Sequence, residues 1–316
     1  MTVDLSTSLG SRVDLANPVM TAAGVAGFST ELAGYFDIAA LGAFVTKSLA
    51  HFETRGNPAP RVVGAGAAML NSVGLTGPGI AAWRESDAGL LERSKVKTMV
   101  SIWGRTVADY RRAIAELQGC GDFVVGVEIN VSCPNLEDRN KMFAHSVSAV
   151  SEIMDATSLS LWPRFVKLSP NTHLLAEVID ACRTGGADGV VLVNTAMGLS
   201  LDRDLLAPSL GAKGGGMSGP ALRAIAVRAI YESYSNWPDL PIVGVGGIAT
   251  SADAIEAIAA GASAIQVGTA SFVEPRAAMK VLASLPAGIE KLGFSSVSQL
   301  VGAAHRGGIA ATKRMD

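Results

Sequence analysis

The chain has 316 residues, of which 49% are hydrophobic and 17% are charged, and its formal net charge is −2. This composition excludes an intrinsically disordered chain, and the near-neutral charge provides no basic field for nucleic acid or for an acidic membrane surface. The best candidate for a membrane span, residues 258–273, is interrupted by Gly261, Gln266 and Gly268, so we expect no transmembrane helix.

The opening residues, 3–13, carry Gly10 and Ser11 in their middle and predict a small hairpin. Beyond them, short apolar segments predict eight strands: residues 19–22, 43–47, 99–103, 126–130, 164–167, 189–193, 242–245 and 264–267. Helices are predicted over residues 106–118, 174–184, 221–234 and 251–260, the last of which opens on the capping residue Ser251.

Strands that alternate with helices predict a parallel sheet, and a count of eight favours closure into a barrel over a doubly wound sheet. No linker or low-complexity segment divides the chain. We therefore expect an α/β fold, a single-domain (β/α)8 TIM barrel over residues 1–316, with the N-terminal hairpin on the barrel floor. Two connections are long for such a barrel, residues 48–79 and 131–143, and are expected to be substrate walls or lids.

Glycines end the seventh and eighth predicted strands, as Gly246-Gly247 and Gly268-Thr269. Without a Cβ atom the backbone can approach a phosphate, and barrel enzymes often bind phosphate between these two strand ends. Either pair alone could be an ordinary turn, but together they indicate a phosphate-bearing cofactor. The run 214–220 is interpreted as a flexible lid, as a helix amino terminus aimed at the same phosphate, or as a floppy connection.

Lys47 and Lys167 each end an apolar strand. A buried ammonium is costly without an anion, so two lysines on one rim predict a site for a carboxylate or a reduced flavin; the alternative is that both reach solvent. Asparagines near strand ends or in rim loops can complement an imide or pyrimidine edge, although each alone is more commonly a turn residue. They are Asn71, Asn130, Asn135 and Asn194.

The three cysteines have neither disulfide nor metal-site spacing, and the amino terminus lacks a charged-then-apolar pattern, so we expect a cytoplasmic protein without a metal. Cys120 and Cys182 are interpreted as packed small hydrophobes. Cys133, in a polar loop before Pro134, is either a half-buried thiol without a role or a base or nucleophile whose thiolate a nearby positive group favours. No histidine has the spacing of a partner, which favours proton abstraction over acyl transfer.

Together these residues resemble the type 1 dihydroorotate dehydrogenases, flavin barrels of pyrimidine synthesis, from about Asn17 to Phe272. The motifs that carry the resemblance are Asn17-Pro18-Val19-Met20, Thr46-Lys47-Ser48, Arg55-Gly56-Asn57-Pro58-Ala59-Pro60-Arg61, Met69-Leu70-Asn71-Ser72-Val73-Gly74-Leu75, Asn130-Val131-Ser132-Cys133-Pro134-Asn135, Val166-Lys167-Leu168-Ser169-Pro170-Asn171, Val193-Asn194-Thr195, Gly215-Gly216-Met217-Ser218-Gly219-Pro220 and Gly246-Gly247. The motifs around Asn71 and Lys167 resemble the 1B subgroup more than 1A. Such 1B enzymes are catalytic subunits that pass electrons to a partner carrying FAD and an iron–sulfur cluster, and thence to NAD.

The resemblance implies that FMN lies across the barrel mouth, with Lys167 at its pyrimidine edge, and that Cys133 removes the C5 proton of dihydroorotate as the C6 hydride passes to the flavin. Implied cofactor contacts are Ala23, Lys47, Ser48, Ser101, Asn130, Lys167, Val193, Gly219, Gly246, Gly247, Gly268 and Thr269. Implied substrate contacts are Lys47, Asn71, Ser72, Val73, Gly74, Leu75, Asn130, Asn194 and Thr195. Family members often pair as dimers, so a homodimer is expected, while the electron acceptor, NAD through a partner or fumarate, stays open.

The chain departs from the family pattern at several positions. It has Ala23 where Ser is usual, Ser101 where Asn is usual, Thr76-Gly77 where Gln-Asn is usual, and Trp103 where a small residue is common. These changes concern flavin and substrate contacts, so an FMN-dependent oxidoreductase of another dihydropyrimidine or cyclic imide is the second hypothesis. A third is a non-catalytic barrel that binds or assembles other proteins.

Overall fold

The computed structural model describes residues 2–135 and 141–308. Its central element is a sheet of parallel strands in sequence order, and the bridge between Met20 and Ala43 joins the first strand to the second. The strands are β3 (Val19–Thr21), β4 (Phe44–Val45), β7 (Thr98–Ile102), β8 (Val124–Asn130), β11 (Arg164–Leu168), β12 (Gly189–Leu192), β15 (Ile242–Val245) and β16 (Ala264–Val267). All eight predicted strands and the TIM barrel are confirmed, whereas the single domain stays a prediction.

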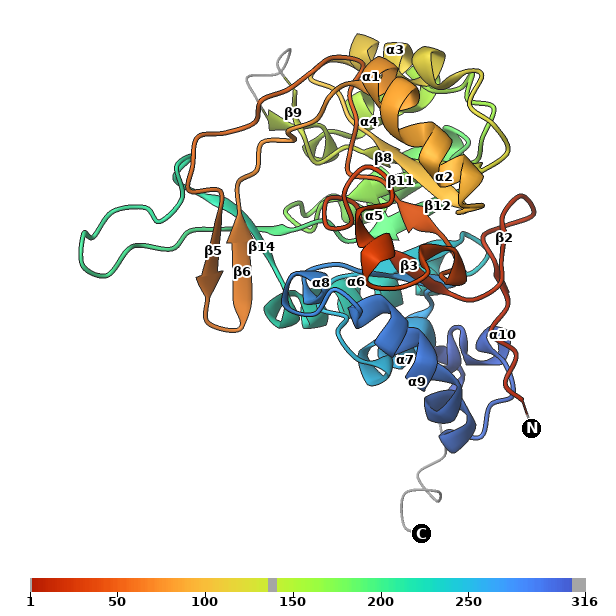
Figure 1. Ribbon diagram of the computed structural model, residues 1–316. Helices are drawn as coiled ribbons and strands as arrows, with labels where there is room; N and C mark the ends of the chain where they lie inside the picture. The colour runs from red at the N-terminus through yellow and green to blue at the C-terminus, as the bar shows by residue number, and fades with distance from the viewer. Residues whose placement is uncertain (1, 136–140, 309–316) are drawn as a thin grey trace.

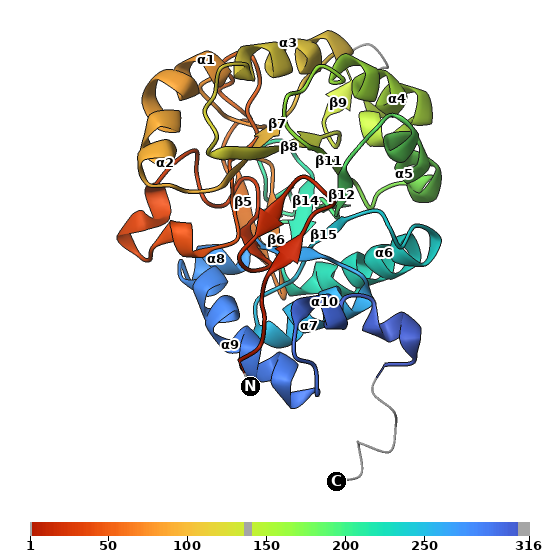
Figure 2. The same cartoon turned by 90° about the vertical axis from the view of Figure 1, so that its right-hand side faces the viewer.

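Helices surround the barrel strands (Figure 2). The α-helices are α1 (Ile80–Trp83), α2 (Gly89–Arg93), α3 (Val107–Leu117), α4 (Val147–Ala156), α5 (Leu175–Thr184), α6 (Arg223–Asn236), α7 (Ser251–Ala260), α8 (Ala270–Val273), α9 (Ala277–Lys291) and α10 (Val297–Leu300). The 3-10 turns are η1 (Glu31–Gly34), η2 (Ile38–Ala40), η5 (Phe143–His145), η6 (Pro220–Leu222) and η7 (Ala303–Arg306), and η3 (Arg84–Ala88) is a π-helical turn. The four predicted helices are thereby confirmed as α3, α5, α6 and α7.

Local capping explains where two of these helices begin. Thr106 caps α3, and its hydroxyl accepts a hydrogen bond from the Asp109 amide while the Asp109 carboxylate accepts one from the Thr106 amide. Thr250 and Asp253 form the same box at α7. The prediction that Ser251 caps α7 was wrong by one residue, because Ser251 is already helical and Thr250 has the extended backbone that a cap requires.

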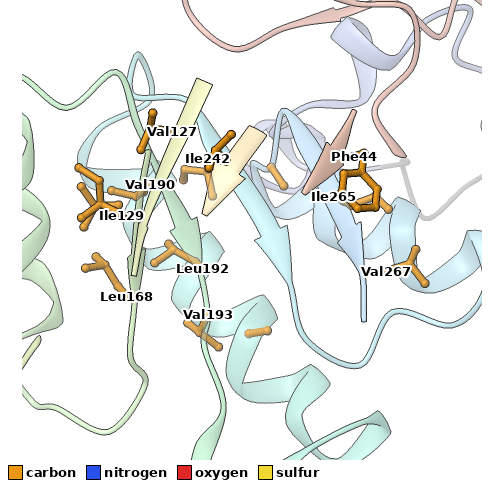
Figure 3. Packing of buried hydrophobic residues seen from close by; sticks show 14 of the residues in the cluster. Phe44, Val127, Ile129, Leu168, Val190, Leu192, Val193, Ile242, Ile265 and Val267 are labelled. Carbon is orange, nitrogen blue, oxygen red and sulfur yellow. The ribbon is translucent and has the colours of Figure 1, made fainter. Parts of the chain in front are cut away.

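Side chains alternate between the two faces of each barrel strand, which separates an outer apolar layer from the barrel interior. On β8, Val127 and Ile129 belong to the large apolar cluster that packs strands against helices (Figure 3). The intervening Glu128 reaches across the interior to Gln266 on β16. Alternation on β8 therefore directs Glu128 and Asn130 inward.

The lower part of the interior is apolar and closed by the predicted hairpin, formed by β1 (Thr7–Ser8) and β2 (Asp14–Leu15). Leu9 and Leu15 pack there with Met99 and Phe165 from the barrel strands. The hairpin lies across this end of the barrel (Figure 2). Gly10 lies in the turn of the hairpin and has φ 70°. The second strand begins at Asp14, just beyond the predicted range of residues 3–13.

A second sheet projects on the side away from the hairpin (Figure 1). It is antiparallel, in the order β13 (Ala196–Gly198), β14 (Gly215–Ser218), β6 (Ala68–Asn71) and β5 (Val62–Ala65). The run 214–220 is thus largely a strand paired with β6, not a lid or floppy connection, although Pro220 does begin a helical turn. The predicted loop 131–143 contains β9 (Pro134–Asn135) and β10 (Lys141–Met142), and residues 136–140 lie outside the described part.

Within residues 2–135 and 141–308, no helix has the length and apolar character of a membrane span.

Candidate active site

A cavity of about 760 Å³ lies above the carboxyl ends of the barrel strands, beside the projecting sheet. The structure brings nearly all of the predicted site residues to its wall: Ala23, Lys47, Ser48, Asn71, Ser72, Val73, Gly74, Leu75, Asn130, Cys133, Lys167, Val193, Asn194, Thr195, Gly219, Gly246, Gly247, Gly268 and Thr269. Ser101 is the exception. Its short side chain is buried below the cavity, where it bonds to Ser48 and Glu128, so the prediction of a direct cofactor contact is not supported.

One end of the cavity is lined by glycines that no other residue could replace without rearrangement. Gly247 has φ 70°, and a Cβ atom there would lie 2.6 Å from Cβ of Arg223. A Cβ atom on Gly246 would lie 2.8 Å from Cβ of Ala226. Gly268 and Thr269 line the same cavity. The crowding against α6 explains why this turn is glycine, and a backbone without Cβ atoms can approach an anion closely.

Lys47 provides a positive charge that is not neutralised by the described protein. Its side chain is half-buried, its ammonium lies 5.3 Å from the Phe28 ring centre, and no carboxylate in residues 2–135 or 141–308 forms an ion pair with it. Burial lowers the pKa of Lys47, and repulsion from Arg61 lowers it further. An anionic ligand group would relieve both effects.

Beside Lys47, residues 73–75 form a strained turn that lines the cavity. Gly74 has φ 73° and Leu75 has φ 56°, a region that leucine rarely adopts. Arg61 holds the neighbouring loop, because its guanidinium donates to the carbonyls of Asn57 at 2.6 Å and Arg55 at 2.9 Å. This turn presents backbone amides in a conformation that the surrounding loop enforces.

Lys167 is almost fully buried, and its ammonium contacts Glu128 and Gln266 in the barrel interior. Its ammonium lies 3.5 Å from a Glu128 carboxylate oxygen and donates to Oε1 of Gln266 at 3.2 Å. Gln266 in turn donates to the other Glu128 oxygen at 2.7 Å. Sequence reasoning assigned no role to Glu128 or Gln266, although a carboxylate and a carboxamide inside otherwise apolar strands are a signal that could have identified them.

A chain of amide hydrogen bonds crosses the cavity wall. Asn130 donates to the Ser48 hydroxyl at 3.3 Å, and Asn194 donates to Oδ1 of Asn130 at 3.2 Å. The Asn71 amide donates to the carbonyl of Gly216 at 3.3 Å, which ties it to β14. The side chain of Asn135 lies outside the described part of the chain.

Two further polar residues of the wall were missed. Asn171 bridges the carbonyl of Thr195 at 3.0 Å and the amide of Met197 at 2.7 Å. The buried Ser132 hydroxyl lines the cavity and has no hydrogen-bond partner among the described residues. A buried polar atom without a partner beside a cavity indicates a ligand contact there.

Cys133 lines the same cavity, but its surroundings differ from the expected polar loop. The thiol is 1% exposed and packs with Ala50 and Trp103. Burial raises the pKa of Cys133 well above its ordinary value, and the role of Cys133 as a base stays a prediction. Its polar neighbours are the Asn130 carbonyl, 3.6 Å from Sγ, and the Tyr110 hydroxyl.

The other two cysteines match their interpretation as packing residues. Cys182 is fully buried in the outer apolar cluster, and Cys120 is half-buried against it. Only Cys133 among the three lines the cavity. The thiol, the lysines and the glycine turn therefore share one end of the barrel, and this is the arrangement expected of a barrel active site.

Comparison with known proteins identifies the family. The family model described as dihydroorotate dehydrogenase matches residues 5–289. A protein of Aquifex aeolicus provisionally named dihydroorotate dehydrogenase A (fumarate) is 39% identical over 306 residues, covering 96% of this chain and 99% of that protein.

Two relatives carry a different subunit name. Dihydroorotate dehydrogenase B (NAD(+)), catalytic subunit, of Geotalea uraniireducens is 36% identical over 301 residues, covering 95% of this chain and 98% of the relative. The protein of that name from Pelobacter propionicus is 38% identical over 307 residues, covering 96% and 99%. With the fold, the cavity and near-complete coverage in agreement, this chain belongs to the dihydroorotate dehydrogenase family of oxidoreductases.

Proposed function

We propose that this protein oxidises dihydroorotate to orotate in de novo pyrimidine synthesis, with FMN as cofactor and Cys133 as the base. The observation that carries the proposal is that Cys133, Lys47, Lys167 and the Gly246-Gly247 turn line one cavity. A base, two cations and an anion cradle are the groups that the reaction requires together.

The residues present fit FMN. The cavity has the volume of a cofactor-sized site, and the Gly246-Gly247 turn, where a Cβ atom would collide with α6, suits a phosphate. Gly219, Gly268 and Thr269 would complete that end, while Ala23, Ser48 and Val193 would line the ring. When bound, FMN supplies the hydride acceptor. Lys167, held by Glu128 and Gln266, would place its ammonium where negative charge on the ring can be stabilised.

The substrate carboxylate would meet Lys47 and the backbone amides of residues 73–75. Lys47 is half-buried without a described carboxylate partner, so an anion restores its electrostatic balance. The ring's imide groups need both donors and acceptors, which carboxamides provide. We assign these contacts to Asn71, Ser72, Asn130, Asn194 and Thr195.

Cys133 would accept the C5 proton. Its apolar niche of Ala50, Trp103, Phe52 and Leu75 excludes water from the sulfur and restricts its position. A base held in one orientation against the substrate avoids the entropy cost of a collisional proton transfer. The strained Leu75 therefore both packs against the base and belongs to the turn assigned to the substrate.

The test is the absorbance spectrum of the purified protein before and after anaerobic addition of dihydroorotate. Rapid bleaching of the flavin is expected, and an unchanged spectrum would reject the proposal. Cys133→Ser should retain flavin yet slow the bleaching at least about a hundredfold, within the range attributed to general base catalysis. Loss of the yellow colour in that variant would contradict the role of Cys133.

A second candidate substrate is another dihydropyrimidine or cyclic imide. It is favoured by Trp103, which shares an apolar cluster with Cys133 where the family pattern has a small residue, and by the burial of Ser101 away from the cavity wall. Dihydrouracil in the same anaerobic assay separates the two substrates. Bleaching by dihydrouracil but not by dihydroorotate would replace the first assignment with the second.

For electron transfer, we propose a 1B-like catalytic subunit that works as a homodimer core with a partner carrying FAD and an iron–sulfur cluster. The B-subunit names of two relatives support this assignment, while the name of the Aquifex relative supports fumarate. Steady-state assays of the chain alone test this assignment, because a 1B-like subunit needs its partner to reduce NAD and should turn over by itself with neither NAD nor fumarate. Turnover of the chain alone with fumarate as the electron acceptor would overturn the 1B-like assignment. The cytoplasmic location stays a prediction.

A further inference from the structure

The niche of Cys133 poses a chemical problem that Cys133 cannot solve alone. A cysteine must be deprotonated to a thiolate before it can act as a base, yet this sulfur lies in an apolar cluster with Trp103, Phe52 and aliphatic groups. A buried anion without a hydrogen-bond donor is strongly disfavoured. A donor aimed at the sulfur is therefore required if Cys133 acts as assigned above, and the inference that follows rests on that proposed function.

Tyr110 is placed to be this donor. It projects from α3 and is fully buried, and its hydroxyl donates to the Asn130 carbonyl at 2.8 Å. The Cys133 thiol donates to the same carbonyl oxygen at 3.6 Å, and hydrogen bonding with Tyr110 acts to lower the pKa of Cys133. The two groups therefore converge on one acceptor, and a small rotation of the hydroxyl hydrogen redirects it from oxygen to sulfur.

We propose that Tyr110 is a positioning residue for Cys133, whose hydroxyl donates to the sulfur in the thiolate form and to the Asn130 carbonyl in the thiol form. In the reaction the substrate C5–H bond breaks and an S–H bond forms at Cys133, and bound FMN would supply the acceptor for the C6 hydride. Tyr110 keeps its own proton throughout. Only the acceptor of its hydrogen bond changes.

Tyr110 is suited to donate and not to ionise. Burial raises the pKa of Tyr110 well above its ordinary value, and the neighbouring Cys133 raises it further. Its ring is held edge-on to Phe143 at 5.5 Å, on a helix whose start is fixed by the Thr106 cap. A hydroxyl held in one place keeps its proton and offers it to the sulfur without reorganisation.

Two charged groups near this niche interact with other side chains. His51 is bonded to Asp109 at 2.9 Å, and Arg105 stacks over the rings of Phe52 at 5.0 Å and Trp103 at 5.9 Å. Lys47 also lines the cavity. Among residues 2–135 and 141–308, none of these cations hydrogen bonds to the sulfur. Tyr110 is thus the described donor side chain at Cys133.

The test compares Tyr110→Phe, which removes one hydroxyl and keeps the ring, with Ser233→Ala. Ser233 is a matched control, because its buried hydroxyl also donates to a backbone carbonyl, that of Ala229 at 2.6 Å, away from the cavity. Two pH profiles are measured on the purified proteins: alkylation of Cys133 by iodoacetamide, followed by peptide mass spectrometry, and flavin reduction by dihydroorotate in a single turnover.

In Tyr110→Phe both profiles should move to higher pH by about one to two units, the equivalent of one hydrogen bond to a charged group, while Ser233→Ala matches the wild type. The inference would be overturned if the Tyr110→Phe profiles had their midpoints at the same pH as the wild type, or if the rates fell by the same factor at every pH. If the wild-type flavin is not reduced by dihydroorotate, the proposed function fails, and the alkylation profile alone still decides whether Tyr110 acts on Cys133.

Discussion

Replacing Glu128 with glutamine removes the negative partner of Lys167 while leaving the shape of the side chain almost unchanged. Both side chains are nearly inaccessible, at 6% for Lys167 and 0% for Glu128, so water cannot replace the lost partner. At their separation of 3.5 Å and an effective dielectric of about 20, the attraction is about 5 kcal/mol. Breaking a buried pair from one side typically costs about 3–5 kcal/mol, so Glu128→Gln should lower the free energy of unfolding by about that amount.

The measurement is urea unfolding of Glu128→Gln beside Glu152→Gln. Glu152 is exposed on α4 and loses the same charge, so the free energy of unfolding of that control should change by no more than about 0.5 kcal/mol. The variant should also retain less flavin, because Lys167 would lose the negative charge that helps to hold its ammonium in place. If Glu128→Gln unfolds at the same urea concentration as the control, then the pair does not stabilise the barrel and the reasoning is wrong.

Three further outcomes are expected. Gly247→Ala places a Cβ atom 2.6 Å from Cβ of Arg223, so FMN binding should become roughly tenfold or more weaker, and the flavin content measured by absorbance should fall. The control is Gly66→Ala, where φ is 63° and the added Cβ atom meets open space, and this variant should bind FMN normally. Lys47→Ala should weaken orotate binding by roughly ten- to a hundredfold, as read from the flavin spectrum, and unaltered affinity would refute the carboxylate contact. Because the pKa of Lys47 is lowered, its positive charge is present at low pH and lost as the pH rises. Orotate binding should therefore weaken at a pH below the ordinary lysine value of 10.5, and an orotate affinity that does not change with pH would contradict this.

Much of the barrel was predictable because its strands are defined by local sequence. Short apolar segments with β-branched residues ended where the chain became polar or glycine-rich, and those ends are the rim of a parallel barrel. Once the strands were assigned, period-two alternation directed Lys47, Asn130 and Lys167 to the same interior. The clustering of these residues around one cavity therefore followed from strand boundaries alone.

The strand at residues 215–218 was not predictable by the same means. A run of glycines has low strand propensity and no alternation, and its extended conformation depends on pairing with β6, more than a hundred residues earlier. The placement of Ser101 likewise depended on partners, since its hydroxyl is held by Ser48, just beyond β4, and by Glu128 of the neighbouring strand β8.

The chain's own sequence determined the barrel, the rim that carries the lysines and amides, and the glycine turn at the seventh strand, because each depends on residues close together in the chain. Only the tertiary structure decided that Cys133 sits in an apolar niche beside Tyr110, and that Lys167 is paired with Glu128 and Gln266. The physical reason is that a side chain's dielectric surroundings and hydrogen-bond partners come from elements far apart in the sequence, and these surroundings set which protonation state each group prefers.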